Sequence, residues 1–188
     1  MKKIFYEGIT KIYLDTESKL ITKSILKNVI NLDYIKQLKE EYAICSKIKM
    51  DNIRSAIQIK ENYNSVELIM VYIEGKTIAQ YLKNDVETDA KILLMYNIAK
   101  ALQKIHNNDI LHLNINSNNI IRSKEKIIFI DFGNSIWKKY DNELSGIYSL
   151  QEAKYISPEM SRRVNKQVDF YSDIYSLGIV FYEIIYGK

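Results

Sequence analysis

Apolar and polar residues alternate in short β-rich pieces along the front of the chain, which predicts strands. Three strands are expected at residues 4–6, 10–14 and 20–26. A helical stripe of apolar residues then runs through residues 34–48, and Asp33 is the expected N-cap. Two more strands are expected at residues 53–59 and 66–72. This part of the chain therefore predicts a five-stranded antiparallel sheet with one helix.

After Gly75 the pattern becomes helical. Thr77 is expected to cap a short helix that ends near Leu82, and longer helices are expected at residues 88–107 and 172–186. Two short strands are expected between them, at residues 119–122 and 127–130, whereas residues 134–154 show no periodicity. The order of the elements predicts an α+β protein with two lobes, residues 1–73 and 74–188.

Composition narrows the function classes only slightly. The chain has 188 residues, a net charge of +4 and scattered basic residues, so no nucleic-acid face is expected. Its single cysteine, Cys45, excludes an internal disulfide and indicates a reduced, cytoplasmic setting. The most apolar stretch, residues 177–186, is too short to span a membrane and contains Glu183.

Four motifs in a fixed order carry the chemistry. The segment His-Leu-Asn-Ile-Asn-Ser-Asn-Asn begins at His112, and Asp-Phe-Gly begins at Asp131. Tyr-Ile-Ser-Pro-Glu begins at Tyr155, and Asp-Ile-Tyr-Ser-Leu-Gly begins at Asp173. Asp-Phe-Gly alone is a weak signal, but the four together in this order and spacing are specific. The chain resembles the protein kinase family, and most of all the kinase-like domains at the front of bacterial hybrid sensor histidine kinases.

The resemblance implies a protein-kinase-like bilobal fold that binds ATP and Mg²⁺. It assigns Lys23 and Glu41 to holding the phosphates, and Asn119 and Asp131 to the metal. The alternatives are that Lys23 and Glu41 are surface charges and that Asp131 caps a loop. Further residues are expected to contact the nucleotide: Gly8, Ile12, Met70, Val71, Ile73 and Ile121. His112, Phe132 and Cys45 are expected in an apolar stack, and Asp173 is expected to brace the catalytic loop.

The sequence departs from the family pattern at several positions. Asn114 stands where the family has its catalytic aspartate, and an amide cannot accept the proton of a substrate hydroxyl; losing a general base costs about 10²–10⁴-fold in rate. Leu113, Asn116 and Glu152 also differ, and the phosphate-covering loop has the single glycine Gly8. The chain stops directly after the family's αF helix, so the last helices and the arginine partner of Glu159 are missing. One side of that helix is expected to be exposed.

Three functions remain open from the sequence. The first is an ATP-binding kinase-like signalling domain with weak or lost transfer to protein Ser/Thr, that is, a pseudokinase. The second is an active, atypical Ser/Thr kinase, in which Asn114 orients the hydroxyl. The third is an interaction module without nucleotide, and a small-molecule phosphotransferase fits less well. The expected partners are ATP and a protein substrate or signalling partner on the exposed helix, without nucleic acid or membrane. The chain is expected to be a fragment, a truncated gene product or a chain that needs a partner.

Overall fold

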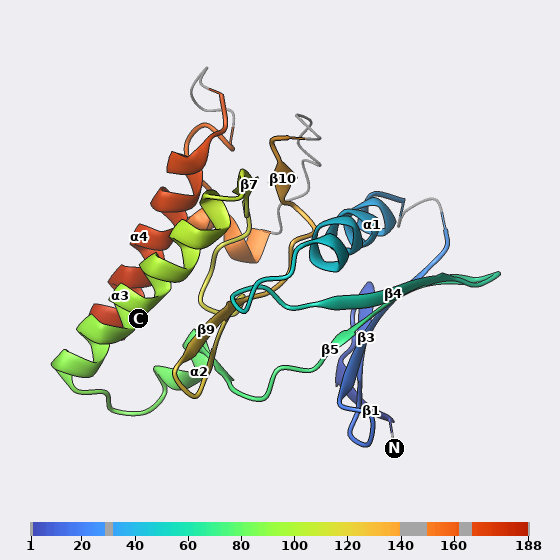
Figure 1. Ribbon diagram of the computed structural model, residues 1–188, viewed down its shortest axis with the longest axis horizontal. Helices are drawn as coiled ribbons and strands as arrows, with labels where there is room; N and C mark the ends of the chain where they lie inside the picture. Colours follow the sequence, from blue (N-terminus) through green and yellow to red (C-terminus); the bar gives the residue numbers. More distant parts are fainter. Residues whose placement is uncertain (1, 29–31, 140–149, 162–166, 188) are drawn as a thin grey trace.

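The computed structural model describes residues 2–28, 32–139, 150–161 and 167–187. These residues form two lobes: a twisted sheet with one helix, and a mainly helical part in which two long helices lie side by side (Figure 1). The α+β architecture predicted from the order of the elements is confirmed. The predicted division at residues 73 and 74 falls in the connection between the large sheet and the helical part.

The large sheet has five antiparallel strands: β1 (Lys2–Tyr6), β2 (Thr10–Asp15), β3 (Leu20–Leu26), β4 (Ala56–Glu61) and β5 (Ser65–Val71). Their spatial order is β1-β2-β3-β5-β4. Alternation along β3 buries Ile21, Lys23 and Ile25 on one face. Lys23 lies opposite Leu68 of β5, whose side chain is also buried. The period of two therefore places a lysine on the core side of the sheet.

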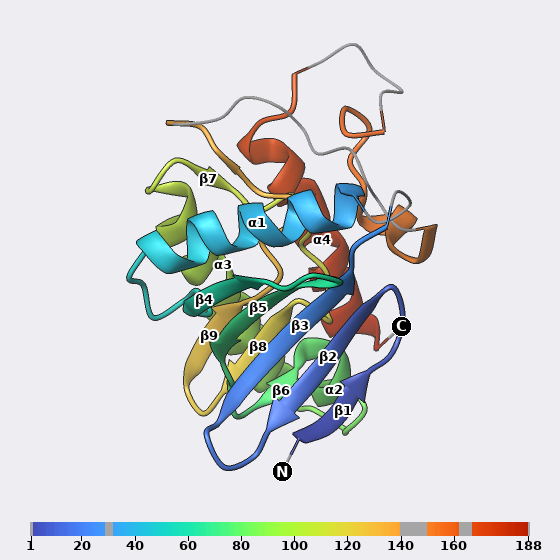
Figure 2. The same ribbon diagram turned by 90° about the vertical axis from the view of Figure 1, so that its right-hand side faces the viewer.

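The helix α1 (Leu32–Lys47) packs against β4 and β5, and Figure 2 shows it crossing the sheet near these strands. Its buried stripe contains Ile35, Leu38, Glu41 and Cys45. Glu41 lies three residues after Leu38, so helical spacing directs its carboxylate inward with the apolar side chains. The same two periodicities that build the core thus bring Lys23 and Glu41 to the same face.

The helical part contains α2 (Ile78–Tyr81), α3 (Thr88–His106) and α4 (Phe170–Tyr186). Thr77 caps α2 with a capping box, as the sequence predicts for its start. The small strands β6 (Lys76–Thr77), β8 (Ile120–Ser123) and β9 (Lys126–Phe129) form one sheet, and β7 (Ile110–Leu111) pairs with β10 (Ile136–Trp137). A 3-10 helix covers Leu150–Tyr155. No helix among the described residues combines the length and apolar character needed to cross a membrane.

Several boundaries differ from the sequence predictions. The strand predicted to begin at Ile53 begins at Ala56, because Ile53 pairs instead with Phe129 of β9 in an isolated parallel bridge. Asp33 is not the N-cap of α1 but lies in its first turn. The helix α4 begins two residues earlier than predicted, because the side chain of Asp169 caps it together with Ser172. Part of the segment predicted to lack periodicity lies outside the described residues.

The expected exposure of the last helix is confirmed. Six large apolar or aromatic side chains of α4 are at least 42% exposed: Tyr171, Ile174, Tyr175, Tyr182, Ile185 and Tyr186. The opposite side of α4 is buried at Leu177, Val180 and Ile184 and packs against α3. The helix thus has one buried and one exposed apolar face.

Candidate functional site

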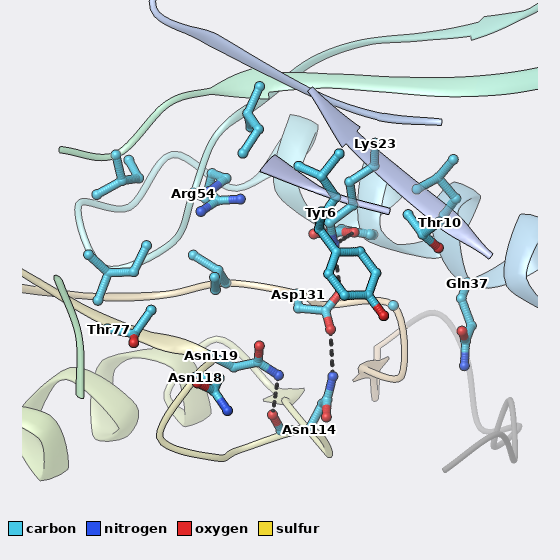
Figure 3. Close-up of a pocket in the computed structure, with 18 of the residues that line it drawn as sticks. Tyr6, Thr10, Lys23, Gln37, Arg54, Thr77, Asn114, Asn118, Asn119 and Asp131 are labelled. Carbon is cyan, nitrogen blue, oxygen red and sulfur yellow. Dashed lines mark hydrogen bonds and ion pairs between the residues drawn. The ribbon is translucent and has the colours of Figure 1, made fainter. Parts of the chain in front are cut away.

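A cleft of about 620 Å³ lies between the sheet and the helical part (Figure 3). Its lining includes the five residues that the sequence places at the centre of the site, which are Lys23, Glu41, Asn114, Asn119 and Asp131. The volume lies within the usual range for small-molecule sites. Segments separated by more than a hundred residues therefore converge on a single cavity.

Lys23 joins two carboxylates at the back of this cleft. Its Nζ atom lies 2.6 Å from Oε2 of Glu41 and 2.6 Å from Oδ1 of Asp131. Lys23 and Glu41 are 8% and 2% exposed, whereas the Asp131 side chain keeps 38% of its surface accessible. Glu41 is thus held in the interior, and Asp131 faces the cavity.

Burial and charge act in opposite directions on these three groups. Burial alone lowers the pKa of Lys23, but Asp131 and Glu41 outweigh it and the net shift is upward. Burial raises the pKa of Asp131, but Lys23 outweighs it and the pKa falls below its usual value. Burial dominates for Glu41, whose pKa rises. The lysine is therefore firmly protonated and Asp131 is ionised at neutral pH.

Asn114 contacts the second carboxylate oxygen of Asp131. Its Nδ2 atom donates a hydrogen bond to Oδ2 of Asp131 at 2.8 Å (Figure 3). Both carboxylate oxygens of Asp131 thus accept hydrogen bonds from the protein, Oδ1 from Lys23 and Oδ2 from Asn114. An aspartate at position 114 would instead place a second negative charge beside Asp131. The amide at position 114 thus gives the neighbouring carboxylate a hydrogen-bond donor.

The loop that carries Asn114 is held together by its own amides. The Nδ2 atoms of Asn116 and Asn119 donate to the carbonyl oxygen of Asn114 at 3.2 and 2.9 Å. Oδ1 of Asn116 accepts hydrogen bonds from the backbone N–H groups of Asn118 and Asn119. Asn119 lines the cleft with its side chain partly engaged in this network.

Asp173 fixes the start of this loop from below. Its two oxygens accept the backbone N–H groups of His112 and Leu113, each at 2.8 Å, and Oδ2 also lies 2.9 Å from Nε2 of His106. Leu113 has φ 55°, a left-handed conformation that is costly for a leucine. The buried carboxylate offsets this cost, and the arrangement matches the bracing role expected for Asp173.

The predicted apolar stack is present. The rings of His112 and Phe132 are 4.5 Å apart, and Phe132 and Cys45 are buried in the same hydrophobic cluster. Burial lowers the pKa of His112 and raises the pKa of the Cys45 thiol. Both shifts favour the neutral forms, so these groups act as packing residues.

The expected nucleotide contacts divide into two groups. Ile12, Ile73 and Ile121 line the cleft. Gly8, Met70 and Val71 do not: Met70 is fully buried in the sheet, and alternation turns Val71 to the opposite face, where it is 37% exposed.

The backbone of the expected adenine contact is also partly engaged. The N–H groups of Val71 and Tyr72 donate to the carbonyl oxygens of Ser55 and Lys19. A Cβ atom on Gly8 would lie 2.9 Å from the ring of Tyr6, which covers the loop. The nucleotide roles of Gly8, Met70 and Val71 stay predictions.

Sequence reasoning missed several residues that line the cleft, among them Tyr6, Gln37, Arg54 and Thr77. Arg54 is the most unusual of these, because it is a cation with only 6% of its surface exposed. Its signal in the sequence is an arginine next to Ile53 at the edge of an apolar run. Ser172 Oγ donates to Glu159 Oε1 at 2.6 Å, so the carboxylate that the resemblance pairs with an arginine has a contact among the described residues.

Comparison with known families matches residues 8–188 to the protein kinase domain. The chain belongs to the protein kinase family. A probable serine/threonine-protein kinase of Clostridium acetobutylicum is 30% identical over 173 residues, which is 89% of this chain and 26% of that protein. The serine/threonine-protein kinase PrkC of Bacillus subtilis is 27% identical over 96% of this chain and 29% of its own length. Serine/threonine-protein kinase ULK3 of Mus musculus is 26% identical over 97% of the chain and 39% of its length.

This kinase domain has the antiparallel-sheet N-lobe and helical C-lobe of its family. The chain spans less than a third of the length of the two bacterial relatives described above. Their whole activities therefore do not transfer to it directly. What the chain adds is its own cleft, in which Lys23 pairs with two carboxylates and asparagine amides hold the loop below them.

Proposed function

We propose that this kinase domain binds ATP in the cleft and has weak or no phosphoryl transfer to protein Ser/Thr. The hydrogen bond from Asn114 to Asp131 carries the proposal. It places a neutral amide where the resemblance expects the general base, while Lys23 and Glu41 stay paired. Lys23, held by Glu41, is the group that would grip the phosphates. The two carboxylates that line the cleft, Glu41 and Asp131, are both paired with Lys23, and the described lining contains no further carboxylate or imidazole to stand in for the missing aspartate.

Asp131 and Asn119 are the residues that would hold Mg²⁺, which would neutralise the phosphate charge. A carboxylate and an amide oxygen fit a hard divalent cation in type. Each oxygen of Asp131 already accepts one hydrogen bond, from Lys23 or from Asn114, and keeps a second lone pair for a metal ion. A metal ion would therefore share this carboxylate with two protein donors.

An active, atypical Ser/Thr kinase is the second candidate, and one observation favours it. The Lys23–Glu41 pair is fully formed, and catalysis of phosphoryl transfer depends mainly on positioning and electrostatics. In that case Asn114 would orient the substrate hydroxyl through its Oδ1 atom. The cytoplasmic setting and a signalling partner on the exposed face of α4 also belong to this proposal, supported by the single buried cysteine and the apolar residues of that face.

Radiolabelled phosphate transfer from Mg-ATP to a generic protein substrate separates the two candidates. Asn114→Asp restores a carboxylate and is expected to raise the rate by about 10²-fold or more if the missing base limits transfer. Asn64→Asp, the same substitution at an exposed position away from the cleft, is the control and is expected to leave the rate unchanged. A wild-type rate equal to that of the Asn114→Asp variant would favour the active kinase.

A thermal-shift measurement with ATP tests the nucleotide site independently of catalysis. Ligand at about a hundred times its Kd stabilises a protein by about 2.7 kcal/mol. If millimolar ATP gives no shift with or without Mg²⁺, the domain is a nucleotide-free interaction module.

A further inference from the structure

Arg54 is a buried cation with no protein partner for part of its guanidinium. Its Nε atom is fully buried and has no hydrogen-bond partner among the described residues. Both carboxylates at the back of the cleft pair with Lys23, and neither forms an ion pair with Arg54. Burying a charge without a partner is costly, so a group left in this state points to a ligand.

The position of Arg54 places that ligand in the cleft. The residue follows Ile53, and its backbone N–H donates to the carbonyl oxygen of Phe129, two residues before Asp131. Its side chain lines the same cavity as Lys23, Asn114 and Asn119. Figure 3 shows Arg54 and Lys23 on the sheet side of the cavity, with Asp131 and the asparagines below them. Two cations thus line one cavity.

A charge count shows what Arg54 changes. With Glu41 ionised beside Lys23, the side chains of Lys23, Glu41 and Asp131 together carry a net charge of −1, which repels a polyphosphate and calls for a metal ion to offset it. With Arg54 the four side chains sum to zero. A guanidinium stays ionised when buried, although burial lowers the pKa of Arg54 against the opposing effect of Glu41 and Asp131.

The hydrogen bonds of Asp131 also favour a site that does not require a divalent ion. When Lys23 turns from Asp131 towards a phosphate, the amide of Asn114 still donates to the other oxygen of this carboxylate. The protein therefore supplies a partner for Asp131 where a divalent ion would otherwise be needed. Arg54 then supplies hydrogen-bond donors in a planar fork that suits phosphate oxygens.

We propose that Arg54 is a ligand-binding residue of the cleft and that, with Asn114, it allows the cleft to bind a nucleoside triphosphate without a divalent cation. This inference rests on the proposed nucleotide-binding function. It differs from that function in the role of the metal, which becomes dispensable for binding.

Isothermal titration with ATP, once in excess EDTA and once with MgCl₂, tests the inference on the whole chain. Wild-type protein is expected to bind ATP in EDTA with a Kd within about threefold of that in Mg²⁺. Arg54→Met removes the charge at similar volume and is expected to weaken binding in EDTA by about tenfold or more, the effect of one charge-assisted hydrogen bond. In Mg²⁺ the loss is expected to be smaller.

Arg122→Met is the matched control. Arg122 stacks on Tyr81 and does not line the cleft, so its loss is expected to leave both Kd values unchanged. An Arg54→Met protein should fold, because an apolar side chain replaces a buried unpaired charge. Its unfolding transition measured without nucleotide verifies this.

Three other outcomes of the titration would each refute one part of the proposal. Binding by wild-type protein only in Mg²⁺ would refute the metal-independent site and leave the nucleotide-binding function standing. Equal affinities of wild-type and Arg54→Met protein in EDTA would refute the role of Arg54. Absence of binding in both buffers would refute the nucleotide-binding function itself and this inference with it.

Discussion

The two walls of the cleft differ in how they are held. The upper wall is built from charges, with Lys23 paired to Glu41 and Asp131 and with Arg54 beside them. The lower wall is built from amides, in which Asn114, Asn116 and Asn119 hydrogen-bond to one another and to the backbone. In the proposed function, the charges of the upper wall would hold the phosphates. The amides of the lower wall would keep the loop in place without supplying a base.

This difference shows how the loop keeps its geometry with an amide at position 114. The loop is anchored by Asp173, which accepts two backbone N–H groups and does not touch the cleft. An amide in place of a carboxylate at position 114 leaves that anchor intact. It also gives a hydrogen bond, in place of repulsion, where the loop meets Asp131. The anchor of the loop and the ion pairs of the upper wall are thus separate sets of contacts.

Removing the cation of the upper wall is expected to have the largest effect on stability. Lys23→Met leaves Glu41 buried without its partner, and breaking a buried ion pair costs about 3 kcal/mol or more. Urea denaturation without nucleotide measures the change in the free energy of unfolding.

Lys126→Met provides the control for this variant. Lys126 pairs with Asp51 at the surface, where both side chains are more than 60% exposed, so no measurable change is expected. If Lys23→Met and Lys126→Met were equally mild, the charges of the upper wall would not hold it together.

Much of this arrangement could be predicted from the sequence, because it follows from local periodicity. Alternation in β3 buries Lys23, helical spacing in α1 buries Glu41, and motif spacing brings Asp131 to the same point. The unpredicted features arise from contacts between distant segments. The two-residue strands β7 and β10 carry no periodic signal and exist only through their pairing.

At the site, the contacts of Arg54 and Asn114 also could not be predicted from the sequence. The position of Arg54 depends on the bridge between Ile53 and Phe129, which shifts the start of β4 away from the alternating pattern. The substitution at Asn114 is visible in the sequence, but its hydrogen bond to Asp131 depends on the left-handed backbone of Asp131, with φ 69°. Spacing along the chain specifies neither contact.

Introducing a charge into the lower wall is expected to have a smaller effect. Asn114→Asp replaces a 2.8 Å hydrogen bond to Asp131 by two facing carboxylates, one of them partly exposed, and is expected to cost about 1 kcal/mol at pH 7.5 in EDTA. Urea denaturation gives the difference from wild type. The cost should shrink as the pH falls towards 4, because one of the two carboxylates then takes up a proton.

The Asn64→Asp variant is the natural comparison for this measurement. Its side chain is exposed away from the cleft, and its stability should match that of the wild type at both pH values. An Asn114→Asp protein as stable as wild type in EDTA would mean that the amide does not stabilise Asp131.

The last effect concerns the pH dependence of the lower wall, whose amides do not titrate. His112 lies in this loop, and burial lowers its pKa in the folded state below that of the unfolded chain. A depressed pKa contributes stability that is present above the unfolded value, near 6.5, and is lost as the pH falls through the folded value. Between pH 7.5 and 5 the free energy of unfolding should therefore decrease, by at most about 1.4 kcal/mol per pH unit for one proton.

His112→Phe keeps an aromatic ring against Phe132 and removes the titration, so this slope should flatten in its unfolding curves. An unchanged slope would mean that groups other than His112 cause the pH dependence of stability in this range.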